Sequence, residues 1–239
     1  MRAGLLAMAV LPGLGTGAAR SLVDVGVAPW RGVVRVQTEL GGRCSGALIG
    51  ARLVLTAAHC VYAQRTGGRV QPGSVHVLSG YDHGVYAGHA RAVSIEVGAG
   101  FGMLPGLRPI ASAPPAADWA VLTLDGPIGT PDRILPVLRE ALPAGTAVML
   151  GGYEQDRAQV MVADLECRLV ASDVMLRHDC AATRGVSGAP LLARGPDRKW
   201  AVIGVASLAA LGGAGGEAVP ISAIPARAME ADGAARSLR

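Results

Sequence analysis

Three residues of the chain have side chains and surroundings suited to nucleophilic catalysis. His59 follows a β-branched apolar run, Asp118 directly precedes another such run, and Ser187 lies in the glycine-rich segment 184–190. A serine hydroxyl is a poor nucleophile unless a base takes its proton, and an imidazole does so near neutral pH when a carboxylate fixes its tautomer. Glycines beside the serine let the backbone approach a substrate and expose its N–H groups. The sequence therefore predicts a hydrolase whose nucleophile is a serine.

The order of these residues along the chain distinguishes between folds. Histidine, aspartate, serine is the order in double-barrel proteases, whereas α/β-hydrolases place the histidine last. No histidine follows Ser187, and Ala189 occupies the place of the last glycine in Gly-x-Ser-x-Gly. A subtilisin-like order needs an aspartate ahead of His59, and Asp24 is available there without a supporting motif. The order favours a double-barrel protease and leaves an esterase on another fold as a distant alternative.

The four cysteines form two pairs that are close in sequence, Cys44 with Cys60 and Cys167 with Cys180. An even number of cysteines in an exported chain indicates disulfides, and four cysteines allow three connectivities. Local pairing is favoured, and each such bond stabilises the fold by roughly 3 kcal/mol if it acts through chain entropy. Zinc is the alternative, but no Cys-x-x-Cys pair exists and the adjacent His59 and Cys60 lack the spacing of two ligands from one turn. We expect neither a metal nor a cofactor.

The N-terminal residues have the pattern of a secretory signal. Arg2 precedes the apolar run 5–14, and small residues follow it. The run is too short for the roughly 20 residues of a membrane span, and proline and glycine interrupt it. We predict that residues 1–19 are a signal peptide cleaved after Ala18 or Ala19, which leaves a secreted or periplasmic protein without stable membrane insertion. A buried N-terminal segment of a cytosolic protein is the alternative.

Composition places the rest of the chain among folded all-β proteins. Of 239 residues, 51% are hydrophobic and 17% are charged, which excludes intrinsic disorder. The 34 glycines and 15 prolines favour short strands joined by turns over long helices. The net charge of +4 comes from singly scattered arginines and one lysine, Lys199, so no basic stripe for nucleic acid is present.

Short β-type runs fall into two sets on either side of a segment rich in proline and glycine, 126–145, which predicts a crossing between two domains. The runs are 33–38, 45–55, 75–78, 92–97 and 119–124 in the first set, and 147–150, 160–163, 167–171, 174–176, 190–192 and 200–206 in the second. Their spacing predicts sandwiches or barrels rather than βαβ units, and two small barrels would fit. The one helical stretch is about 222–231, with Ser222 as N-cap and Gly233 as a stop.

The prediction is therefore of two domains after the signal peptide. Residues 20–125 form an N-terminal β-barrel that carries His59 and Asp118. Residues 126–239 form a C-terminal β-barrel that carries Ser187 and ends in the short helix and a tail.

The catalytic candidates lie in longer motifs that resemble those of a known family. The motifs are Cys44-Ser45-Gly46, Thr56-Ala57-Ala58-His59-Cys60, Asp118-Trp119-Ala120, Gly185-Val186-Ser187-Gly188-Ala189-Pro190 and Gly204-Val205-Ala206-Ser207. Over most of residues 29–225 the chain resembles the trypsin-like (chymotrypsin-fold) serine peptidases. The motif around Ser187 resembles the family's Gly-Asp-Ser-Gly-Gly-Pro but departs from it at Val186 and Ala189. The His-Asp-Cys sequence at 178–180 is similar to the bacterial glutamyl-endopeptidase-like branch.

This resemblance implies a fold of two six-stranded antiparallel β-barrels and a set of roles. His59 is then the general base, Asp118 orients it, and Ser187 attacks the peptide carbonyl to form an acyl-enzyme. The backbone N–H groups of Gly185 and Ser187 form the oxyanion hole. A protein or peptide is the implied substrate, and we expect a monomer.

The resemblance also implies which residues bind the substrate. Ala181 occupies the position where trypsins have a carboxylate at the floor of the primary pocket, and Ala182 next to it is also uncharged. Cleavage after Arg or Lys should therefore be poor, and small or medium apolar side chains are favoured. Thr183 and His178 offer hydrogen bonds to an acidic side chain, which is the alternative. The strand that ends at Ser207 pairs with the substrate backbone.

Val186 replaces an aspartate that binds a newly freed N-terminal ammonium in the activated members of the family. Valine cannot make that ion pair, so we expect the oxyanion hole to be ordered without a freed N-terminal amine.

Two functions follow from the sequence: an exported serine endopeptidase, or a catalytically silent relative that binds a protein in the cell envelope.

Overall fold

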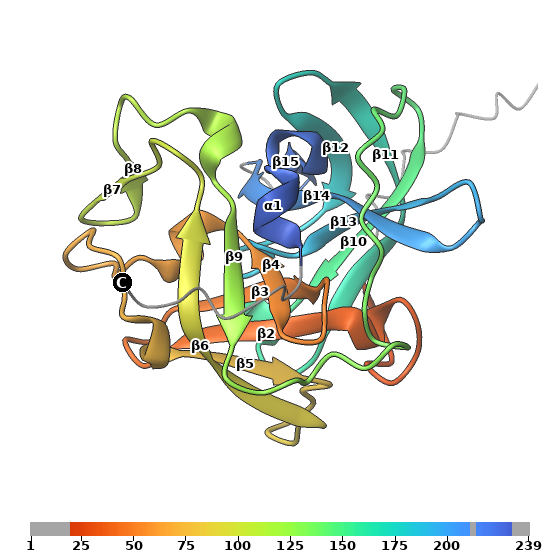
Figure 1. Cartoon of the computed structure of the whole chain (residues 1–239). Helices are drawn as coiled ribbons and strands as arrows, with labels where there is room; N and C mark the ends of the chain where they lie inside the picture. The colour runs from red at the N-terminus through yellow and green to blue at the C-terminus, as the bar shows by residue number, and fades with distance from the viewer. Residues whose placement is uncertain (1–19, 211–213, 231–239) are drawn as a thin grey trace, which may run out of the picture.

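The computed structural model describes residues 20–210 and 214–230, which form two β-barrels that pack side by side (Figure 1). The first barrel is closed, with the strand order β2-β3-β4-β9-β6-β5. Its strands are β2 (Val33–Thr38), β3 (Arg43–Leu48), β4 (Leu53–Thr56), β5 (Val75–Ser79), β6 (Gly88–Val97) and β9 (Ala120–Leu124). A separate hairpin, β7 (Met103–Leu104) with β8 (Arg108–Pro109), extends from the connection between β6 and β9.

The second barrel has the order β11-β10-β13-β14-β15-β12, and β12 pairs with β11 to close it. Its strands are β10 (Ala147–Gly152), β11 (Val162–Ser172), β12 (Leu176–Ala181), β13 (Pro190–Arg194), β14 (Trp200–Ala209) and β15 (Ala214–Pro220). All pairings in both barrels are antiparallel. The expected all-β fold of two six-stranded antiparallel barrels with a short C-terminal helix is confirmed.

One hydrophobic core joins the two barrels. Every residue of β4 is buried, and this strand of the first barrel also contacts β14 of the second. The same core cluster contains Leu55 and Val34 from the first barrel and Met149 and Val202 from the second. Apolar packing across the junction fixes the barrels relative to one another, so side chains from both can form one site.

The chain before the first barrel belongs to the sheet of the second. Strand β1 (Ser21–Leu22) pairs with β11, with Ser21 opposite Ala163 and Leu22 opposite Val162. The division of the chain into two domains between residues 125 and 126 stays a prediction. The pairing of β1 with β11 shows that the N-terminal end of the described chain packs on the second barrel rather than on the first. The expected signal peptide, 1–19, lies outside the described residues.

The C-terminal helix is shorter than the sequence predicted. Helix α1 spans Ala226–Met229, and Ser222 is not its N-cap but lies in the 3-10 turn η6 (Ile221–Ala223). Pro225 separates the two because proline has no N–H group and is accommodated only at the start of a helix. The proposed stop at Gly233 lies outside the described residues.

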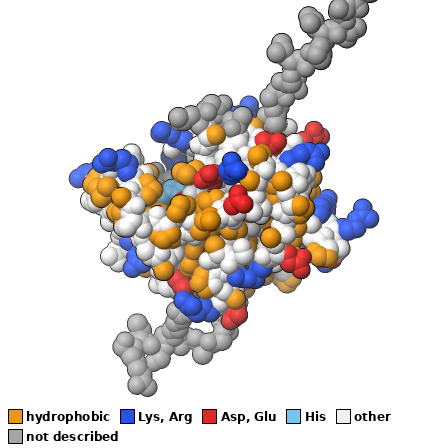
Figure 2. All heavy atoms as spheres, turned by 90° about the horizontal axis from the view of Figure 1, so that it is seen from above, with side chains coloured by type: hydrophobic (Ala, Val, Ile, Leu, Met, Phe, Trp, Pro, Cys, Tyr) orange, Lys and Arg blue, Asp and Glu red, His pale blue; other side chains and the backbone are white. Residues whose placement is uncertain are grey.

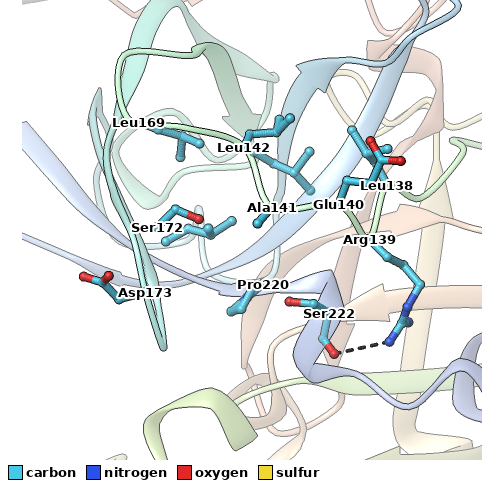
Figure 3. Close-up of a pocket in the computed structure, with 12 residues that line it drawn as sticks. Leu138, Arg139, Glu140, Ala141, Leu142, Leu169, Ser172, Asp173, Pro220 and Ser222 are labelled. Atoms are coloured by element: carbon cyan, nitrogen blue, oxygen red, sulfur yellow. Dashed lines mark hydrogen bonds between the residues drawn. The ribbon is translucent and has the colours of Figure 1, made fainter.

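The segment 126–145 connects β9 of the first barrel to β10 of the second and carries no strand. Its Arg139 donates hydrogen bonds to the carbonyl oxygens of Ser222 at 3.2 Å (Figure 3) and of Ile224 at 2.9 Å, so this segment is tied to the C-terminal turn. The cavity beside Arg139 has a volume of about 80 Å³, which is room for a few water molecules rather than a peptide side chain.

The surface shows mixed charge. On the face in Figure 2, basic side chains are spread around the molecule and interspersed with acidic and apolar ones. Among the described residues, no helix is long and apolar enough to cross a membrane.

Candidate active site

His59 lies at the end of β4, in the 3-10 turn η2 (Ala58–Val61), at the junction of the barrels. Its Nδ1 is 2.8 Å from Oδ2 of Asp118, and its backbone N–H donates to Oδ1 of the same carboxylate at 2.9 Å. Asp118 is held between the turn η4 (Pro115–Ala117) and strand β9. A proton on Nδ1 that faces a carboxylate leaves Nε2 as the basic nitrogen, so this pair fixes the tautomer that a general base requires.

A buried hydroxyl completes the surroundings of Asp118. Ser207 Oγ, in β14 of the second barrel, donates to Oδ2 of Asp118 at 2.5 Å. Burial alone would raise the pKa of the Asp118 carboxyl, but the charge of His59 and hydrogen bonds from His59 and Ser207 outweigh it and lower that pKa. Asp118 therefore stays ionised beside the imidazole.

The backbone of Ser187 is fixed on both sides. Its carbonyl accepts the N–H of Ser45 at 2.8 Å, and the N–H of Gly188 donates to the carbonyl of Ala206 at 2.7 Å. Gly188 has a φ of +79°, and a Cβ there would overlap Thr56 Oγ1 and the carbonyl of Ser45. The glycine after the nucleophile candidate is therefore required by both conformation and space.

The loop before Ser187 presents unpaired backbone donors. Gly185 has a φ of +98° and lies against the backbone of residues 153–155. Its carbonyl accepts Ser45 Oγ at 3.1 Å, and Ser45 Oγ also accepts the N–H of Tyr153 at 2.8 Å. Within the part of the chain that is described, the N–H groups of Gly185 and Ser187 donate to no protein group. Two free neighbouring donors are what an oxyanion hole needs.

These groups open onto one cleft of about 580 Å³ between the barrels. Among its lining residues are Arg43, His59, Gln64, Phe101, Met103, Leu107, Asp118, Thr183, Arg184, Gly185, Ser187 and Ser207. The loop that contains the β7–β8 hairpin forms an apolar part of this wall. His59, Asp118 and Ser187, which are distant in sequence, are thus brought to one place, although no hydrogen bond joins His59 to Ser187.

The expected substrate-binding residues divide into two groups. Thr183 and Ser207 line the cleft, whereas Ala181 and Ala182 do not. Ala182 is buried, and the N–H of Ala181 donates to the buried carboxylate of Asp164 at 2.8 Å. The two alanines thus lie behind the described wall of the cleft.

Both local disulfides are present. Cys44 is bonded to Cys60, which directly follows His59, and Cys167 is bonded to Cys180. Sγ atoms of the first pair and a ring nitrogen of His59 lie within 4.8 Å of one another. The disulfide occupies both sulfurs, so they are not the thiolates that zinc would require.

Two features of the site have no signal in the sequence. The bond between Ser207 and Asp118 spans 89 positions, and that between Arg20 and Glu154 spans 134. Neither pair belongs to a motif with local spacing, so only the folded chain reveals them.

His178, which the sequence offered as a contact for acidic substrates, is buried in β12 outside the cleft. Its ring nitrogens have no hydrogen-bond partner among the described residues, and the ring packs against Gly216. Burial lowers its pKa to about 4, and the nearby Asp179 and Asp164 only partly oppose this effect.

Replacing His178 with leucine should make the fold less sensitive to acid. The unfolded chain takes up the imidazole proton near pH 6.5 and the folded chain only near pH 4, so the free energy of unfolding falls by up to roughly 3 kcal/mol as the pH drops through that window. His178→Leu removes this part of the loss. Denaturant titrations at pH 7 and pH 4.5 measure the fall in the free energy of unfolding for each protein. An equal fall in both proteins would show that His178 does not cause it.

The two closed barrels and the cleft between them define the chymotrypsin-like fold. The sequence model of the Trypsin family matches residues 21–229, and the chain therefore belongs to the trypsin family. No curated protein sequence matches the chain significantly.

Solved structures share the fold at low identity. A Glu endopeptidase, solved in complex with MPD, has 21% identity and a TM-score of 0.71, covering 88% of this chain and 95% of that chain. The human heparin binding protein has 18% identity and a TM-score of 0.66, covering 86% of this chain and 92% of that chain.

Proposed function

We propose that the protein is an exported serine endopeptidase that hydrolyses peptide bonds through His59, Asp118 and Ser187. The observation that carries the proposal is the hydrogen-bonded His59–Asp118 pair in the same cleft as Ser187 and two free backbone N–H groups. Family membership supports a peptidase, and the geometry supports these residues for it.

In the proposed mechanism, Ser187 Oγ attacks the carbonyl carbon while His59 Nε2 takes its proton. Asp118 stabilises the imidazolium that forms. The N–H groups of Gly185 and Ser187 donate to the oxyanion, and one such donor typically lowers the barrier by about 3–4 kcal/mol. His59 then protonates the leaving amine, and an acyl group remains on Ser187. Water, deprotonated by His59, releases the acid and restores the serine.

A catalytically silent protein-binding module of the cell envelope is the second candidate. The separation of Ser187 from His59, which share no hydrogen bond, favours it. Catalytic hydrogen bonds are often long in proteins without substrate and tighten on binding, so this separation is also compatible with an enzyme. The two candidates differ in one outcome, which is whether the purified protein turns over any peptide.

Export and a monomeric state are part of the proposal. The two disulfides support an oxidising compartment, because cytosolic reductants keep thiols reduced. Signal removal after Ala18 or Ala19 would leave Arg20 at or next to the N-terminus.

Cleavage after Arg or Lys should be poor. Among the described residues that line the cleft, Asp118 is the only carboxylate, and His59 and Ser207 already occupy it. Asp164, behind Ala181, accepts the N–H groups of Ala181 and Glu166. A buried cationic side chain would therefore lack a partner, which costs several kcal/mol. We propose that the protein prefers to cleave after residues with small or medium apolar side chains.

A mixed peptide library, digested by the purified protein and read by mass spectrometry, tests both the activity and its preference. We expect cleavage after small or medium apolar residues, with cleavage after Arg or Lys at least tenfold weaker. Dominant tryptic cleavage would overturn the preference. Dominant cleavage after Glu would favour the acidic alternative, which Arg43 and Arg184 on the cleft wall and the similarity to a Glu endopeptidase support. An intact library would favour the binding module.

A further inference from the structure

A cluster of charged side chains lies directly behind the loop that carries Ser187. The guanidinium of Arg20 forms ion pairs with Glu154 and, at 2.8 Å, with Asp156. Thr183 donates its N–H to Glu154 Oε2 at 2.9 Å and its hydroxyl to the same oxygen at 2.6 Å. The Thr183 hydroxyl also accepts a hydrogen bond from Arg20 at 3.2 Å. Arg20 therefore connects the start of the described chain to the first residue of the segment 183–187.

Glu154 depends on these partners. Its side chain is 1% exposed, and burial raises its pKa, while Thr183 and Arg20 oppose that shift. A buried carboxylate without a partner is costly, and the planar guanidinium can bridge two carboxylates at once. Without Arg20, the buried Glu154 would lose its only cationic partner within the described chain.

The segment that contains Glu154 also sets the orientation of a peptide in the candidate oxyanion hole. The N–H of Gln155 donates to the carbonyl of Arg184 at 2.7 Å. In a trans, planar peptide the carbonyl of Arg184 and the N–H of Gly185 point in opposite directions. Binding that carbonyl to Gln155 therefore turns the Gly185 N–H away from the 153–156 segment, and Gly185 lines the cleft.

We propose that Arg20 is a positioning residue for the oxyanion hole, acting through Glu154 and Asp156 on the peptide between Arg184 and Gly185. This inference rests on the proposed peptidase function and goes beyond it, because it assigns the ordering of the loop to a side chain of the N-terminal segment. It also explains how a chain with Val186 before the nucleophile can order this loop without an ion pair to a freed N-terminal amine.

The test compares Arg20→Ala and Arg20→Lys with the unmodified protein, after the N-terminus of each has been checked by mass spectrometry. We expect kcat to fall about tenfold to hundredfold in Arg20→Ala, with KM changed less than about threefold, because an oxyanion donor acts mainly in the transition state. Arg20→Lys keeps a charge beside Glu154 and should retain more of kcat. A kcat for folded Arg20→Ala within twofold of the unmodified value, a rise in KM alone, or a lysine variant as poor as alanine would each overturn the proposal.

Arg31→Ala is the matched control, because Arg31 makes an exposed ion pair with Asp132 at 2.8 Å and does not line the cleft. It should leave kcat unchanged. If Arg20→Ala does not fold, Asp156→Asn decides the question, since Asp156 is largely exposed and its loss should lower kcat about threefold to tenfold. Unchanged kcat in this variant would overturn the proposal.

Amide hydrogen exchange separates this inference from the proposed function. Exchange in residues 183–187 should be about tenfold faster in Arg20→Ala, even if the unmodified protein has no turnover and the peptidase proposal fails. Equal exchange rates in both proteins would contradict the positioning role.

Discussion

Replacing Ser187 with alanine will lower kcat for peptide hydrolysis by about 10⁵-fold to 10⁶-fold, a loss typical of removing the nucleophile of a serine peptidase. The methyl group cannot form the acyl-enzyme, so only the oxyanion donors and substrate binding remain. The variant should fold normally, because the fixed contacts at this position are made by the backbone of Ser187 and of Gly188.

The matched control for this variant is Ser94→Ala, which removes the hydroxyl of an exposed serine on β6, away from the cleft. It should leave turnover unchanged. Hydrolysis by Ser187→Ala within tenfold of the unmodified rate, measured on protein with the same thermal unfolding midpoint, would remove Ser187 from the mechanism.

Replacing Asp118 with asparagine will lower kcat by about 10⁴-fold near neutral pH. The amide is nearly the same size as the carboxylate, and its one oxygen can still accept the backbone N–H of His59 in place of Oδ1. Its NH₂ group then takes the place of Oδ2, which accepts from Ser207 and faces Nδ1 of His59 in the unmodified protein. It cannot stabilise an imidazolium, and its NH₂ group disfavours a proton on Nδ1 of His59. The substitution is therefore expected to lower the rate of catalysis rather than the stability of the fold.

Asp132→Asn provides the comparison for this second substitution. Asp132 is exposed and bonded to Arg31 and Thr130, so its conversion removes a charge without touching the cleft. Kinetic measurement of both variants decides the role of Asp118. If Asp118→Asn keeps more than a tenth of the unmodified kcat, the His59–Asp118 pair does not act as a base and its orienting group.

The local motifs were predictable because each depends on a few neighbouring residues. The apolar run before His59 becomes β4, the run after Asp118 becomes β9, and the glycines around Ser187 adopt positive φ. The two disulfides could also be predicted, because the paired cysteines are only 16 and 13 positions apart in the sequence. The same short runs predicted sandwiches or barrels, and the family resemblance narrowed the fold to two six-stranded antiparallel barrels.

Strand boundaries were less predictable where β-branched residues are scarce. Strand β12 spans Leu176–Ala181, whereas the sequence placed a run at 174–176. Along β12, Leu176, His178 and Cys180 are buried and alternate with exposed charged residues. This alternation is a true strand signal. Strand β15 was not predicted because it contains glycines, which favour turns over strands.

Long-range contacts could not be predicted from local patterns. The pairing of β1 with β11 and the cluster of Arg20, Glu154 and Thr183 join segments that only the folded barrels bring together. Register and closure of the barrels determine these contacts, and neither leaves a fixed spacing in the sequence. The sequence predicted the residues of the candidate site, and the fold added the side chains that contact them.

The most direct test of the proposed mechanism is covalent labelling of the folded protein with a fluorophosphonate probe, followed by digestion and mass spectrometry. Such a probe reacts only with a serine that a base activates and whose phosphoryl oxygen can enter an oxyanion hole. The mechanism predicts one adduct, on Ser187, that is absent from Ser187→Ala. An adduct on a different serine, or no adduct on the folded protein, would contradict it.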